Sequence, residues 1–69
     1  MIAYYKLLDL LNKRDMTKEQ LKNASGISSA TMTKISKGES VTLKTINAIC
    51  EVLKVQPGDI LEWIPDKKL

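Results

Sequence analysis

Apolar residues recur at intervals of three and four along most of this chain, which is the spacing that places side chains on one face of an α-helix. Near the N-terminus, over residues 2–13, the positions at this spacing are Ile2, Tyr5, Leu8 and Leu11. A second pattern begins at Val41 and comprises Leu43, Ile46, Ile49, Cys50 and Leu53. Both patterns predict amphipathic helices, and no segment shows the strict alternation of a half-buried strand.

Helix caps and a glycine predict two shorter helices in the middle of the chain. Thr17 and Gln20 stand three residues apart, at the spacing of a capping box, in which each side chain accepts a hydrogen bond from the other residue's amide. Gly26 ends this helix at little cost, because glycine adopts the left-handed conformation without a steric penalty. Ser28 caps the next helix. The two predicted helices span residues 17–25 and 28–37.

The short link between these two helices prevents them from lying antiparallel as a long hairpin. They fit a helix-turn-helix, in which the second helix crosses the first and enters the major groove of DNA. On a helical projection of residues 28–37, Met32 and Ile35 face the core, whereas the opposite face carries no large apolar residue. The pattern therefore indicates a DNA-binding function.

The outer face of helix 28–37, the reading helix, supplies the candidate base contacts, because a helix in the major groove presents its N-terminal residues to base edges. These candidates are Ser29, Ala30, Thr33 and Lys34. Lys34 can donate to O6 and N7 of guanine, the hydroxyl groups can pair with several base edges, and Ala30 can touch a thymine methyl group. The alternative interpretation is an ordinary solvated polar face.

The charge distribution agrees with a DNA-binding N-terminal half. The net charge of the 69 residues is +3. Residues 1–38 carry seven Lys or Arg and three Asp or Glu, giving +4, whereas residues 39–69 carry four and five, giving −1. Within the basic half, Lys18 at the start of a helix and Lys37 at the end of the reading helix are candidates for phosphate contacts. Chance asymmetry on a solvated surface accounts for the charge pattern equally well.

The C-terminal part of the chain predicts a short fifth helix. Pro57 suits the first position of a helix, the helix is expected to run through Ile64, and Pro65 ends it. Residues 66–69, DKKL, are expected to form a frayed tail. The sequence therefore predicts a single all-α domain over residues 1–69, a compact bundle of five helices that contains the helix-turn-helix.

The apolar residues near the C-terminus exceed what one short helix buries in a small monomer. They are Ile60, Leu61, Trp63 and Ile64. Burial of two or three of them in the core leaves the others exposed, and contact with a second copy of the chain would cover those. We therefore expect a homodimer with Leu61, Trp63 and Ile64 as candidate interface residues, while Tyr4 and Tyr5 fit either the core or the interface.

Composition argues against several other functions. Cys50 is the sole cysteine and histidine is absent, so neither an internal disulfide nor a structural zinc site is expected. The carboxylates show no spacing typical of a catalytic pair, so we expect neither an enzyme nor a cofactor. No apolar run is long enough for a transmembrane helix or a signal peptide, which predicts a cytoplasmic protein with a reduced Cys50 in its core.

Six short tracts spread over nearly the whole chain carry a resemblance to a known family. They are MTKEQL at 16–21, GIS at 26–28, TMTKI at 31–35, GE at 38–39, TINAICEVL at 45–53 and PGDILE at 57–62. With these tracts the chain resembles the Cro and phage-repressor type of helix-turn-helix domain, the XRE family, and within it the small stand-alone bacterial members. The resemblance implies a five-helix, lambda-repressor-like domain that binds operator DNA, often as a homodimer, and regulates transcription.

The resemblance also assigns individual residues by their position. Ser29, Ala30, Thr33 and Lys34 fall on the base-contact positions of the family. Thr17, Lys18, Ser28 and Lys37 fall on its phosphate-contact positions. We therefore predict a sequence-specific transcriptional regulator, specifically a repressor, that binds an inverted-repeat operator in double-stranded DNA as a homodimer.

Two departures from the family pattern bear on this prediction. Lys22 stands where many relatives have alanine, so its stem is expected to pack between the helices while its ammonium reaches solvent. The reading face lacks Gln and Asn, so specificity is expected to rest more on Lys34, water and DNA shape. The alternative function is a protein-interaction module, such as an antitoxin-like or co-regulator subunit, that keeps the fold but binds DNA weakly.

Overall fold

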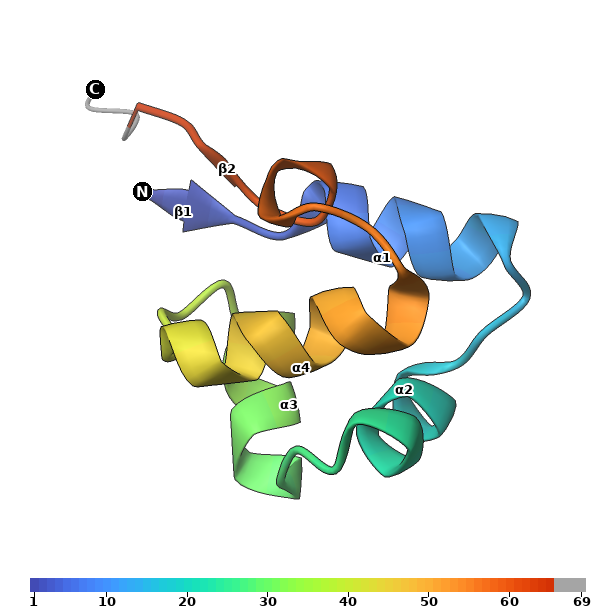
Figure 1. Ribbon diagram of the computed structural model, residues 1–69. Helices are drawn as coiled ribbons and strands as arrows, with labels where there is room; N and C mark the ends of the chain where they lie inside the picture. The colour runs from blue at the N-terminus through green and yellow to red at the C-terminus, as the bar shows by residue number, and fades with distance from the viewer. Residues whose placement is uncertain (66–69) are drawn as a thin grey trace.

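Four α-helices and a small sheet that joins the two ends of the described chain make up the fold (Figure 1). This computed structural model describes residues 1–65, and the predicted frayed tail at 66–69 lies outside them. The helices are α1 (Tyr5–Lys13), α2 (Lys18–Ser25), α3 (Ser29–Ser36) and α4 (Leu43–Leu53). The strands are β1 (Ile2–Ala3) and β2 (Glu62–Trp63), and a 3-10 turn, η1, spans Pro57–Asp59.

The predicted helix α2 is confirmed, and it begins one residue later than predicted because Thr17 is its cap. Thr17 Oγ1 accepts a hydrogen bond from the amide of Gln20 at 3.0 Å, and Gln20 Oε1 accepts one from the amide of Thr17 at 2.8 Å, which completes the capping box. Gly26 adopts the left-handed conformation at φ +76°, and its amide donates to the Lys22 carbonyl at 2.9 Å. These interactions fix where α2 starts and where the turn toward α3 begins.

The helices α3 and α4 also begin behind a hydroxyl cap. Ser28 Oγ accepts a hydrogen bond from the amide of Thr31 at 3.1 Å, and Thr42 Oγ1 accepts one from the amide of Thr45 at 3.2 Å. The helices predicted in these two regions are therefore confirmed. Each begins one or two residues later than predicted, because the cap residue itself lies outside the helix, and α3 also ends one residue early, with Lys37 as its C-cap.

The apolar faces of the four helices meet in one cluster of buried side chains. Its fully buried members come from every helix and from the segment after η1, and they are Leu7, Leu21, Ile35, Ile49, Leu53 and Ile60. In Figure 1, α4 runs between α1 on one side and α3 on the other, and α2 packs against both α3 and α4. Arg14 Nη1 donates to the Leu53 carbonyl at 2.7 Å, so the residue after α1 satisfies a carbonyl at the end of α4.

The predicted fifth helix, from Pro57 to Ile64, is wrong. Helical structure in this segment is limited to the 3-10 turn η1, which is closed by a 2.9 Å hydrogen bond from the Asp59 amide to the Gln56 carbonyl and capped by one of 3.0 Å from the Gln56 amide to Asp59 Oδ2. The chain then extends into β2. Ile60 is fully buried, and its burial together with strand pairing outweighs the weak helical preference of so short a segment. The fold is therefore mainly α-helical with four α-helices, and not five.

The predicted start of the first helix at Ile2 is also wrong, because residues 2 and 3 form β1. This strand pairs antiparallel with β2, so that Ile2 lies opposite Trp63. Beyond the pair, the Ile64 amide donates to the Met1 carbonyl at 2.8 Å, and the N-terminal ammonium donates to the Ile64 carbonyl at 2.6 Å. Pairing between segments so distant in sequence leaves no trace in local apolar spacing, and α1 consequently begins only at Tyr5.

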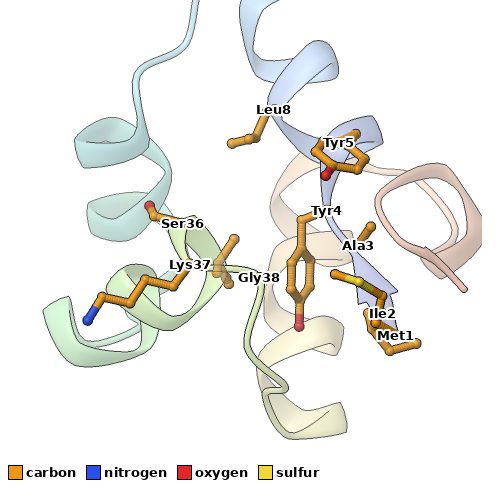
Figure 2. Close-up of a pocket in the computed structure, with 10 residues that line it drawn as sticks. Met1, Ile2, Ala3, Tyr4, Tyr5, Leu8, Ser36, Lys37 and Gly38 are labelled. Atoms are coloured by element: carbon orange, nitrogen blue, oxygen red, sulfur yellow. The ribbon is translucent and has the colours of Figure 1, made fainter. Parts of the chain in front are cut away.

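Tyr4 ties the N-terminal segment to the loop that follows α3. Its ring is buried and its hydroxyl donates to the Glu39 carbonyl at 2.8 Å, whereas Tyr5 is exposed. Burial raises the pKa of the Tyr4 hydroxyl, which further favours the protonated form that donates this hydrogen bond. A small pocket of about 140 Å³ lies beside Tyr4. Figure 2 shows the side chains that line it, with the Lys37 ammonium directed away from Tyr4. Of the two tyrosines, only Tyr4 belongs to the core.

Candidate nucleic-acid interface

The reading helix α3 is anchored by one buried face and presents its other face to solvent. Met32 and Ile35 face the core as predicted, with 8% and 2% of their surfaces exposed. The four predicted base-contact residues are all exposed on this helix, and they are Ser29, Ala30, Thr33 and Lys34. The structure thus places these four side chains on one helix, and no large apolar residue of α3, all of which is described, is exposed beside them.

Three exposed lysines on or near the helix-turn-helix are available for contact with DNA. Lys34 lies on α3, Lys37 follows α3 directly, and Lys18 lies in the first turn of α2. Among residues 1–65, none of these side chains makes a hydrogen bond or an ion pair. Their ammonium groups therefore need not give up an internal partner in order to bind a phosphate or a base.

The two cap residues predicted to contact phosphates differ in what their hydroxyl groups can still donate. Thr17 Oγ1 accepts the Gln20 amide, and its own proton has no partner in the described part of the chain. Ser28 Oγ accepts the Thr31 amide and also donates to Thr31 Oγ1 at 2.9 Å, so its proton is already used. Ser28 is therefore the weaker of the two candidates, because a phosphate oxygen accepts hydrogen bonds and cannot donate them.

Thr33 turns its hydroxyl back onto its own helix. Its Oγ1 donates to the Ser29 carbonyl at 2.9 Å, an interaction between residues four apart that threonine often makes within helices. With its proton used in this way, Thr33 offers DNA a methyl group and an acceptor lone pair. Thr33 can therefore contact a base in two ways, by accepting a hydrogen bond through its hydroxyl oxygen or by packing its methyl group against that of a thymine.

Lys22 spans the space between α2 and the start of α3. Its side chain is 22% exposed, and its Nζ lies 3.2 Å from Ser29 Oγ and 3.1 Å from Glu19 Oε2. The side chain is therefore mostly covered, and its ammonium pairs with Glu19 and Ser29 at the surface. The contact between this ammonium and Ser29 could not be predicted from the sequence, which does not show that Lys22 lies beside a predicted base-contact residue.

Lys44 is a further candidate for a phosphate contact, and the sequence analysis missed it. It lies in the first turn of α4 and lines, together with Ser28 and Thr31, a hollow beside the start of α3. Its position in the predicted helix could have pointed to it, because a lysine in the first turn of a helix is repelled by the positive end of the helix dipole and lowers helix stability. Lys18 in α2 shows the same feature, and residues that break a local rule are frequently found at functional sites.

The sequence predicts Cys50 in the core, but it is only half-buried, in a groove between α4 and residues 55–57. Burial raises the pKa of its thiol, and the negative charge of Asp59 raises it further. Because the thiolate is the reactive form, the raised pKa makes the thiol less reactive at neutral pH. In the described part of the chain, no group of three or more His, Cys, Asp or Glu residues could hold a metal ion, and no helix is long and apolar enough to cross a membrane.

We expect Cys50 to react with iodoacetamide more slowly in the folded protein at pH 8 than in the chain unfolded by urea. The raised pKa lowers the fraction of thiolate in the folded state, so the two rates should approach each other as the pH rises through the folded-state pKa. Mass spectrometry of quenched reactions measures both rates. An equal or faster reaction of the folded protein at pH 8 would contradict this assignment.

Comparisons with known proteins agree with this geometry. The family model of the Cro/C1-type HTH DNA-binding domain matches residues 6–66. Over 60 residues the chain is 40% identical to an uncharacterised HTH-type transcriptional regulator, YozG, of Bacillus subtilis (strain 168), a match that covers 84% of this chain and 71% of the relative. The crystal structure of the transcriptional regulator VanUg, form II, superposes with a TM-score of 0.91 at 45% identity, covering 94% of this chain and 87% of that one. The chain belongs to the family of Cro/C1-type helix-turn-helix DNA-binding domains.

Proposed function

We propose that this protein, a DNA-binding transcriptional regulator, binds an inverted-repeat operator as a homodimer, inserts α3 into the major groove of each half-site and represses transcription by occupying the DNA. The observation that carries the proposal is the outer face of α3, where four exposed residues stand over the buried anchor of Met32 and Ile35. Because chromosomal DNA is the target, the proposal also places the protein in the cytoplasm.

The proposal gives each exposed residue a role according to its chemistry. Lys34 donates to a guanine, and Ser29, Ala30 and Thr33 contact neighbouring bases through a hydroxyl group and two methyl groups. Phosphates are bound by residues that flank the reading helix, and these are Thr17, Lys18, Ser28, Lys37 and Lys44. The ammonium groups of Lys18 and Lys37 have no ion-pair partner among residues 1–65, which supports this arrangement, since binding releases counterions from the DNA without breaking an internal ion pair there.

The homodimer is proposed to form through the apolar residues of the C-terminal segment. Trp63 on β2 is 67% exposed, and the neighbouring Leu61 and Ile64 are half-buried. An exposed tryptophan flanked by apolar side chains is typical of a surface that a partner covers. Two-fold symmetry would then present two copies of α3 to half-sites whose centres are one helical turn of DNA apart, about 34 Å.

We expect Trp63→Glu to convert the dimer to a monomer while leaving the fold intact, because the side chain is largely outside the core and its loss removes apolar contact area. Sedimentation equilibrium measures the mass, and circular dichroism measures the fold. The matched control is Leu43→Glu, which changes another exposed apolar residue, 84% exposed at the start of α4. Dissociation by Leu43→Glu, with Trp63→Glu still dimeric, would place the interface on α4 and overturn the proposed one.

The proposed function is tested by selecting bound duplexes from a random DNA pool at near-physiological salt and sequencing them. Enrichment of an inverted repeat is expected, with half-sites at the spacing of one helical turn. Binding without any enriched sequence, which disappears as the salt concentration rises, would leave only a phosphate-driven affinity and contradict sequence-specific regulation.

The second candidate function is a protein-interaction module that retains the fold and binds DNA weakly. The observation that favours it is the exposure of several large apolar side chains in the described part of the chain, chiefly Tyr5, Leu43 and Trp63. An antitoxin-like or co-regulator subunit would bury such a surface against another protein. The selection experiment separates the two functions, because this module predicts no enriched sequence.

A further inference from the structure

A hydrogen bond connects Lys22 on α2 to Ser29 on the outer face of α3, the face proposed to meet DNA. Lys22 Nζ lies 3.2 Å from Ser29 Oγ, and Ser29 is the first residue of α3. The same ammonium also forms an ion pair with Glu19, whose Oε2 is 3.1 Å away. With only 22% of its side chain exposed and two partners for its ammonium, Lys22 is more restrained than a surface lysine.

This hydrogen bond has a fixed direction, which restricts what the Ser29 hydroxyl can do. A serine hydroxyl has one proton to donate and two lone pairs that accept, whereas an ammonium group only donates. Lys22 therefore occupies one lone pair of Ser29 Oγ and leaves the proton and the second lone pair without a partner in the described structure. A positive charge at this distance also repels the hydroxyl proton, so the proton is turned away from Lys22.

We propose that Lys22 is a positioning residue for base recognition, which biases the Ser29 hydroxyl toward donating a hydrogen bond to DNA and thereby disfavours cytosine at the base that Ser29 faces. This inference rests on the proposed function, in which α3 occupies the major groove. Guanine, adenine and thymine each present an acceptor in that groove, whereas cytosine presents only the N4 amino donor. Lys22 takes one lone pair of Ser29 Oγ, and its positive charge makes the remaining lone pair a poorer acceptor and the hydroxyl proton a better donor. Ser29 is therefore a better partner for the first three bases than for cytosine, whose N4 amino group only donates.

The test compares base preferences of the wild-type protein with those of Lys22→Met, Lys22→Arg and Ser29→Ala. Methionine keeps an unbranched stem between the helices and removes the donors, whereas arginine keeps both the charge and the donors. Duplexes selected by the wild-type protein provide the sites, and Ser29→Ala identifies the base pair that Ser29 faces, because its preference is lost there. Thermal unfolding of each variant shows whether the fold is retained.

At that base pair, we expect the wild-type protein to discriminate against cytosine and Lys22→Met to lose this discrimination by about three- to tenfold, the range of one hydrogen bond. Preferences at the other positions should be unchanged, and Lys22→Arg should restore the wild-type preference. Loss of the positive charge lowers affinity for all duplexes alike, so the readout is the ratio of affinities for two duplexes that differ at this base pair only.

The outcomes separate this inference from the function on which it rests. If Lys22→Met weakens every duplex by the same factor and leaves the ratio unchanged, Lys22 contributes only charge or packing, and the inference is overturned while the proposed function stands. If the wild-type protein enriches no sequence, the proposed function itself fails, and the role assigned to Lys22 fails with it.

Discussion

Replacement of Lys34 by alanine is expected to weaken binding to the selected operator by about 1–3 kcal/mol, with the loss concentrated at one or two base pairs. Lys34 is exposed on the outer face of α3, and its ammonium makes no hydrogen bond or ion pair with residues 1–65. Its full donor capacity is therefore available to O6 and N7 of a guanine. Fluorescence anisotropy with a panel of single-base operator variants measures the affinity and its sequence dependence.

Two sets of variants calibrate the Lys34 result. Lys18→Ala and Lys37→Ala should weaken all duplexes alike and each reduce the slope of log affinity against log salt by about one, because these residues are assigned to phosphates. Lys13→Ala is a charge control, since Lys13 lies on α1, across the bundle from α3 (Figure 1), although its ammonium pairs with Asp9 at 3.2 Å. If Lys34→Ala weakens all duplexes uniformly while Lys18→Ala or Lys37→Ala alters base preference, the outer face of α3 has been assigned wrongly.

The second large effect is expected from Ile35→Ala, which should lower the free energy of unfolding by about 2–5 kcal/mol. Ile35 is 2% exposed and anchors α3 in the core, so its truncation leaves a cavity and removes apolar contacts with the rest of the buried cluster. A core as small as that of a 69-residue chain supplies only a few kcal/mol of net stability. The variant is therefore expected to be largely unfolded near 37 °C and to lose DNA binding for that reason.

Urea denaturation followed by circular dichroism measures this change in the free energy of unfolding. The control is Ser36→Ala, on the same helix but exposed, for which the change should stay within about 0.5 kcal/mol. Binding by Ile35→Ala should return at low temperature if the folded state is repopulated. A loss of less than about 1 kcal/mol would show that α3 is not anchored through this residue.

The helix-turn-helix is predictable from the sequence because its determinants are local. A capping box between Thr17 and Gln20, a glycine at Gly26 and a cap at Ser28 act over three or four residues, and the structure contains all of them. The buried positions Met32 and Ile35 follow from helical geometry alone once the helix is known. The outer face of α3, and hence the candidate base contacts, follows from the same geometry.

The two ends of the chain are not predictable in this way, because their structure depends on each other. Ile2 shows helical spacing with the residues of α1, but it pairs with Trp63 across the sheet, and local periodicity carries no information about that pairing. The segment after Pro57 likewise has a good start signal for a helix. Burial of Ile60 and the pairing of β2 end that helix after one 3-10 turn.

The site shows the same division between local and non-local determinants. The exposure of Lys34 is a property of one helix, whereas the contact of Lys22 with Ser29 depends on how α2 and α3 cross. The position of Lys44 beside Ser28 depends in turn on how α4 packs against α3. Residues contributed by a second helix are therefore the ones that the sequence analysis missed or left without a partner.

The central claim, that α3 is the surface that meets DNA, is tested most directly by nuclear magnetic resonance of the ¹⁵N-labelled protein titrated with a selected duplex. We predict that the largest changes in amide chemical shift fall on Ser29 to Lys34 and on the first turn of α2, with small changes along α1. The largest changes along β2 around Trp63, with the amides of α3 unmoved, would contradict the account and favour a protein-interaction module.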